Sequence, residues 1–168
     1  MQDDEDWRAK SPDASRIGTA VEYLVAATCI LASRGELNVS TALVDDEGVD
    51  LVFHRRGASA TLAVQVKART TDTKVVRGGR FHAQVRGQTF RPRPDYYLLF
   101  VVADVATAMF EMVWLVPSVD YVNLARHAPD GTLRMSASLS ASTDDRWRPC
   151  RLGRAELPGR LLELLPTD

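Results

Sequence analysis

Two polar side chains interrupt an otherwise apolar stretch of the sequence, TLAVQVKART at residues 61–70. Gln65 and Lys67 stand two residues apart, and because successive side chains of a β-strand point to opposite faces, both would leave the same face. An amide oxygen can bind a divalent cation. A neighbouring ammonium group can orient or help to deprotonate a water and stabilise negative charge on phosphorus. The pair alone is also typical of solvated residues on an edge strand, and with a neighbouring carboxylate it would suit metal-assisted hydrolysis of a phosphate ester.

A carboxylate that could complete such a site precedes this strand. Asp50 lies in GVDLVF, which we expect to be a strand over 49–56, and a hairpin between 49–54 and 60–68 would bring Asp50 close to Gln65 and Lys67. Mg²⁺ prefers hard oxygen ligands and needs only two or three from the protein, because water and substrate phosphate supply the rest. The expected ligands are Asp50, Gln65 and the main-chain carbonyl of Val66.

Asp50 has rivals in the same part of the sequence. Asp45 and Asp46 lie in the preceding DDEG turn and could bind the ion instead, and Asp50 could simply end that turn.

A second carboxylate lies in the first predicted helix. Gly18, Glu22, Val25 and Cys29 follow one another at helical spacing, which places Glu22 on or beside an apolar face. A buried carboxylate needs a cation or a donor, so Glu22 could hold Lys67 or an outer-shell water. The alternative is a residue on the helix surface.

The remaining patterns predict the elements that would position these groups in one α/β domain over residues 11–168. A helix should run from Ser11-Pro12 to about Arg34, within which positions 17, 21, 24, 25, 28 and 31 recur at helical spacing. DYYLLFVVAD should form a central strand covered on both faces. We expect a mixed central sheet flanked by helices and a frayed, acidic segment over residues 1–10. The predicted strands are 36–44, 49–56, 60–68, a short one at 80–85, 95–104, 112–117 and an edge strand at 132–142, and further helices are predicted at 117–126 and 155–165.

The order of these motifs resembles that of the PD-(D/E)XK nuclease superfamily, over about residues 15–70. The resemblance is to restriction endonuclease-like and Mrr-like members with a Gln-x-Lys variant of the motif. It implies a restriction endonuclease-like fold, Mg²⁺ or Mn²⁺ as cofactor, and catalytic roles for Glu22, Asp50, Gln65 and Lys67. Gln65 stands where Asp or Glu is the commoner residue, which removes one negative charge and should weaken metal affinity.

The segment that follows the predicted catalytic strand is basic. From Lys67 to Arg93 it contains eight basic residues and one acid, Asp72, in a chain whose net charge is −1. A phosphate-contacting surface is the functional interpretation, and a solvated face is the alternative. The residues expected to contact nucleic acid are Arg69, Lys74, Arg77, Arg80, Arg86, Arg91 and Arg93.

Composition excludes several other classes. The acidic start lacks the features of a signal peptide, and the longest apolar run, 23–32, is too short to span a bilayer, so we expect a cytoplasmic protein without a membrane partner. Cys29 and Cys150 match no metal-binding spacing.

The leading hypothesis is a Mg²⁺-dependent nuclease that hydrolyses DNA in restriction, defence or repair. RNA is an alternative substrate, and a homodimer or a larger assembly is compatible with the sequence. Two other classes stay open: a catalytically inactive nuclease-fold module that binds nucleic acid or a protein, and an interaction domain that uses its tryptophans.

Overall fold

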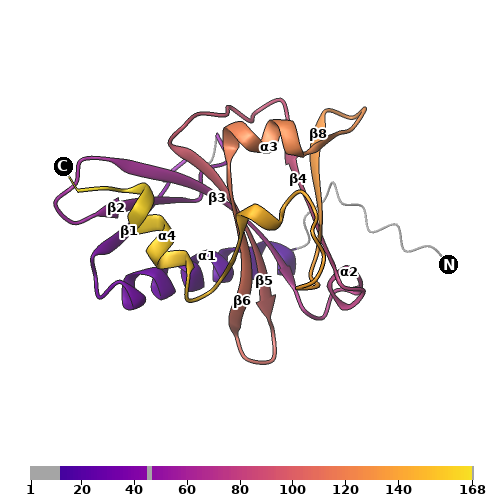
Figure 1. Cartoon of the computed structure of the whole chain (residues 1–168), viewed down its shortest axis with the longest axis horizontal. Helices are drawn as coiled ribbons and strands as arrows, with labels where there is room; N and C mark the ends of the chain where they lie inside the picture. The colour runs from indigo at the N-terminus through magenta and orange to yellow at the C-terminus, as the bar shows by residue number, and fades with distance from the viewer. Residues whose placement is uncertain (1–11, 45–46, 168) are drawn as a thin grey trace.

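The computed structural model describes residues 12–44 and 47–167. The predicted frayed segment at 1–10 and the rival ligands Asp45 and Asp46 lie outside these residues. The main sheet has six strands in the order β1-β2-β3-β5-β6-β9, and β3 and β5 pair in parallel while the other pairs are antiparallel (Figure 1). The predicted mixed α/β sheet is therefore confirmed. Its strands are β1 (Leu37–Thr41), β2 (Leu51–Arg55), β3 (Thr61–Thr70), β5 (Tyr96–Asp104), β6 (Met109–Pro117) and β9 (Arg151–Gly153).

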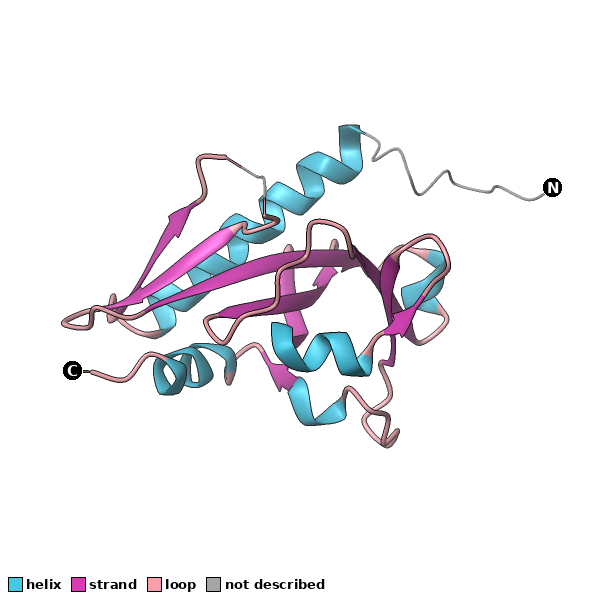
Figure 2. Cartoon of the chain, turned by 90° about the horizontal axis from the view of Figure 1, so that it is seen from above, coloured by secondary structure: helices cyan, strands magenta, loops and turns pink. Residues whose placement is uncertain are grey.

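One face of this sheet is covered by α1 (Pro12–Ala32), which runs along the strands (Figure 2), and by α4 (Leu157–Leu164). Val21, Val25 and Cys29 recur every four residues on α1 and are buried against the sheet. Ile17 and Leu31 recur at helical spacing in the sequence, but they are 44% and 77% exposed. The apolar side of α1 is thus wider than the stripe that packs on the sheet.

The outward apolar residues also change the membrane argument. By length and composition alone, the segment Asp13–Ala32 could cross a bilayer, although the run at 23–32 is short. The same helix supplies Val25 and Cys29, both fully buried, to the core of the domain. The core helix of a folded domain passes the same test of length and composition. This feature alone is therefore not evidence that α1 crosses a membrane.

The other face carries a second, three-stranded sheet, which the sequence did not predict. Its order is β4-β8-β7, with β4 (Arg80–Arg86), β8 (Thr132–Ser138) and β7 (Arg126–His127). The predicted edge strand at 132–142 is therefore wrong: β8 ends at Ser138 and lies between two partners. Two short helices, α2 (Lys74–Arg77) and α3 (Ser118–Leu124), lie between the strands in the chain.

An aromatic core joins the two sheets. Phe81 of β4 packs against Phe100 of β5 and Trp114 of β6, with ring centroids 6.0 and 5.2 Å away. Trp114 and Trp147 are buried, which contradicts the hypothesis that they form an exposed contact surface; Trp7 lies outside the described residues. Because β5 contributes side chains to the cores on both faces, the predicted doubly covered strand is confirmed.

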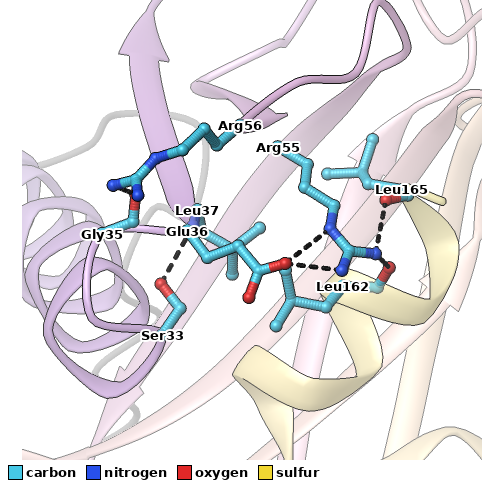
Figure 3. Close-up of polar contacts among 8 residues, drawn as sticks. All are labelled: Ser33, Gly35, Glu36, Leu37, Arg55, Arg56, Leu162 and Leu165. Atoms are coloured by element: carbon cyan, nitrogen blue, oxygen red, sulfur yellow. Dashed lines mark hydrogen bonds and ion pairs between the residues drawn. The ribbon is translucent and has the colours of Figure 1, made fainter. Parts of the chain in front are cut away.

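The end of β2 is tied to the end of α4 by one arginine (Figure 3). Arg55 Nη1 donates to the carbonyls of Leu162 and Leu165, each at 3.2 Å, and Arg55 Nε donates to Glu36 Oε1 at 2.9 Å. The last carbonyls of a helix lack partners within the helix and carry partial negative charge. Arg55 therefore fastens α4 to the hairpin that carries Asp50.

Candidate functional site

The hairpin of β2 and β3 brings Asp50 to the strand that carries Gln65 and Lys67. Leu51 pairs with Val64, so Asp50 follows in register opposite Gln65. The main-chain nitrogen of Asp50 donates to the carbonyl of Val64 at 3.0 Å. Its carboxylate oxygen Oδ2 accepts the main-chain N–H of Val66 at 2.7 Å. The Asp50 side chain thus adds one hydrogen bond beyond the last paired residues of β2 and β3.

The carbonyl of Val66 points to the same edge of β3. Ala63 N–H bonds to Asp95 and Thr71 N–H bonds to Ala103, so the odd-numbered residues of β3 direct their main-chain groups to the β5 side. Main-chain groups alternate between the two edges of a strand, and Val66 therefore faces the β2 side. The paired register of β2 ends at Leu51, so the Val66 carbonyl lies beside the Asp50 carboxylate rather than within a ladder.

Gln65 is buried, with 9% of its surface exposed, and its position is fixed from two sides. The hydroxyl of Tyr96 donates to Gln65 Oε1 at 3.3 Å. Gly48, at a φ of +76°, comes so close that a Cβ atom there would lie 2.5 Å from Gln65 Nε2. Only glycine leaves room for the amide in this backbone conformation. The amide oxygen is therefore held in one orientation.

Arg93 contacts both segments that surround Gln65. Its guanidinium lies 5.1 Å from the centroid of the Tyr96 ring and forms ion pairs of 3.2 Å with Glu47 and Asp95. Glu47 precedes Gly48, and Asp95 precedes Tyr96. Arg93 thus links the two segments that position Gln65.

Lys67 and Glu22 belong to different sides of the main sheet. Lys67 is half-buried and, by alternation, leaves β3 on the same face as Gln65. Glu22 is half-buried on α1, beside the buried Val21, and α1 covers the opposite face. A contact between the two would form around the edge of β3 rather than across a face.

The structure separates the seven predicted nucleic-acid contacts into distinct groups. Arg69 is half-buried, desolvation lowers the pKa of its guanidinium from the usual value, and its Nη1 donates to the Ala68 carbonyl at 2.8 Å. Arg91 Nη1 donates to the carbonyl of Gln88 at 2.8 Å, and Arg93 is ion-paired as described. The other four are exposed on α2 and β4: Lys74, Arg77, Arg80 and Arg86.

Sequence reasoning missed two residues of this site, Gly48 and Tyr96. The GVDLVF motif contains Gly48 at its start, but its closeness to Gln65 depends on the hairpin turn. Tyr96 arrives through the parallel pairing of β5, 31 residues after Gln65.

The atoms that could bind a cation at this site are mainly neutral oxygens. Within residues 12–44 and 47–167, no three His, Cys, Asp or Glu side chains are grouped as a metal site. A cation here would meet the Asp50 carboxylate, the Gln65 amide and the Val66 carbonyl.

Comparisons with known proteins add a likeness in fold. No protein-family model matches the chain, and no curated protein matches its sequence. The bacterial homing endonuclease I-Ssp6803I has a similar solved structure, with a TM-score of 0.52 and 15% sequence identity over 89% of this chain and 94% of that chain. The chain has an endonuclease-like fold. At this identity the likeness concerns the fold and assigns no residue a role.

Proposed function

We propose that the protein is a divalent-metal-dependent nuclease of the PD-(D/E)XK type, which hydrolyses phosphodiester bonds of DNA in the cytoplasm. The observation that carries this proposal is the hydrogen bond from Val66 N to Asp50 Oδ2 at 2.7 Å. It holds a carboxylate against the strand that presents Gln65 and Lys67. The endonuclease-like fold supports the proposal.

The donor set fits Mg²⁺ or Mn²⁺. Asp50, Gln65 and the Val66 carbonyl offer hard oxygens, and Mg²⁺ commonly takes one or two carboxylates and completes its shell with water and substrate phosphate. When bound, the ion would lower the pKa of a water and polarise the phosphate.

The chain's own residues would do the rest. The Tyr96 hydroxyl holds the Gln65 oxygen in place. The Lys67 ammonium would orient the attacking water and stabilise negative charge on the phosphate. Glu22 would orient Lys67 or an outer-shell water.

A cleavage assay tests catalysis. Supercoiled and linear DNA are incubated with Mg²⁺ or Mn²⁺, and Lys67→Ala is compared with the wild type. Loss of one transition-state contact typically costs about a hundredfold or more in rate. We expect that loss for Lys67→Ala, and no loss for Arg56→Ala, an exposed arginine that bonds to the Gly35 carbonyl. Equal cleavage by Lys67→Ala, or none by the wild type, removes the catalytic proposal.

Calorimetric titration with Mn²⁺ tests the metal site. Asp50→Asn keeps an oxygen that can accept the Val66 N–H but removes the charge. We expect measurable binding by the wild type and none by Asp50→Asn. Undiminished binding by the variant would place the ion elsewhere.

One observation favours a second candidate, a catalytically inactive module that binds DNA, RNA or a protein. The Gln65 oxygen already accepts the Tyr96 hydroxyl and brings no charge to hold a cation. Salt-dependent DNA binding without cleavage under any metal condition would select this candidate.

A further inference from the structure

The outer face of the three-stranded sheet is basic. Alternate residues Phe81, Ala83 and Val85 of β4 point inward to the aromatic core, and Leu133, Met135 and Ala137 of β8 do the same. The residues between them form the outer face. The three strands comprise sixteen residues, among which are four arginines, two histidines and no acid. In a chain with net charge −1, this composition is strongly skewed. We define the basic sheet face as Arg80, His82, Gln84, Arg86, Arg126, Arg134 and Ser136.

The register places these side chains in neighbouring rows. Arg134 lies opposite Gln84 on one side and opposite Arg126 on the other. Like charges directly opposite each other destabilise a sheet. Asp130 offsets part of this repulsion through an ion pair of 2.8 Å with Arg134. Arg86 and Arg126 make no side-chain hydrogen bond or ion pair within the described residues. A polyanion bound here would relieve the remaining repulsion.

The basic sheet face comes near the strand of the candidate site at His82 and Arg69. His82 lies close enough to Arg80 and Arg69 for both charges, after burial, to lower its pKa. Arg69 follows Lys67 by two residues on β3, so alternation puts both on one face of the strand. A ligand could therefore extend from the β3 edge onto β4.

The chemistry of the face favours a duplex. The one Phe, Tyr or Trp side chain of the three strands, Phe81, is fully buried, so the exposed His82 is the one ring of the basic sheet face on which an unpaired base could stack. Arginine, glutamine and serine instead suit phosphate oxygens and base edges in a groove.

We propose that the basic sheet face binds double-stranded DNA beside the scissile position. This inference rests on the proposed function for its choice of DNA. It assigns duplex contact to Arg126 and Arg134, which lie outside the predicted basic segment, and it leaves out Arg91 and Arg93, which lie outside the three strands of this face.

Binding measurements test the face without cleavage. A fluorescent mixed-sequence duplex is titrated with the full chain in EDTA, between about 50 and 200 mM salt. The test variant is Arg86→Gln/Arg126→Gln. The matched control is Arg56→Gln/Arg160→Gln, two exposed arginines outside the basic sheet face. A single strand of the same sequence serves as the second probe.

We expect the negative slope of log affinity against log salt to become less steep by about 2 in the test variant, since each lost phosphate contact contributes about 0.9. The control should keep the wild-type slope, and the single strand should bind more weakly than the duplex. An unchanged slope, an equal change in the control, no duplex binding by the wild type, or tighter binding of the single strand would each overturn the inference. Because EDTA prevents cleavage, an inactive protein can still pass this test, and an active one can fail it.

Discussion

At the level of single residues, the site depends on a glutamine that is held in place by its neighbours. Gln65 is buried between the Tyr96 hydroxyl and Gly48, and Asp50 is held by the Val66 N–H. A buried amide with fixed partners is a well-oriented but uncharged ligand. The affinity for a divalent cation should therefore be limited by charge rather than by geometry.

Gln65→Glu tests that limit. Adding a carboxylate where the amide lies should tighten Mn²⁺ binding about tenfold, since ligand charge strongly tunes such sites. Gln65→Met, similar in length but without the oxygen, should weaken binding. Calorimetry measures both, and binding by Gln65→Glu that is no tighter than that of the wild type would show that Gln65 is not a ligand.

Gly48→Ala tests the close contact with Gln65. An alanine at a φ of +76° costs about 1–2 kcal/mol in backbone strain, and its Cβ would also meet the Gln65 amide. Gly57→Ala is a matched control, because Gly57 has a φ of +75° and nothing within 4 Å of the added Cβ. Urea unfolding should show a larger loss of unfolding free energy for Gly48→Ala. Equal losses would mean that the amide moves aside at no cost.

At the level of elements, apolar periodicity predicted the long helix and the strands of the main sheet except β9. It also predicted the hairpin of β2 and β3 that brings Asp50 beside Gln65. It missed β7 and β9 because two or three residues carry no period. The partners of β8 and the position of Tyr96 follow from pairings between distant segments, which local patterns do not encode.

Arg55→Met should loosen α4. The variant keeps a side chain of similar length but loses the bonds to Leu162, Leu165 and Glu36, and we expect a loss of about 1–3 kcal/mol in unfolding free energy. Arg154→Met is the control, because its pair with Glu111 at 3.5 Å is exposed and should contribute less than about 1 kcal/mol. Urea unfolding measures the loss of unfolding free energy in both variants. Equal losses would contradict a special role for Arg55.

At the level of the whole molecule, the main sheet has one apolar core on each face. Cys29 belongs to the core between this sheet and α1, so its accessibility reports whether that core opens. Burial raises the pKa of the Cys29 thiol from 9.0 to about 12. The folded state thus favours the neutral thiol. The corresponding stability is present below pH 9 and is lost as pH rises from 9 towards 12.

Thiol labelling tests whether Cys29 becomes accessible only when the domain unfolds. In a Cys150→Ser variant, which leaves Cys29 as the chain's one thiol, reaction with a thiol reagent should be slow without urea. It should accelerate along the same urea transition as the loss of secondary structure. Rapid labelling of the native protein would show that α1 opens locally.

The parallel pairing of β3 with β5 sets the order in which the chain can mature during synthesis. A nascent chain that ends at Thr70 already contains Glu22, Asp50 and Lys67, but one edge of β3 has no partner until Tyr96–Asp104 is made. Pairings between distant segments form late, because the chain loses the entropy of loop closure before the new contacts stabilise it. The Gln65 oxygen gains its tyrosine only at that stage. The candidate centre therefore matures after most of the domain has left the ribosome.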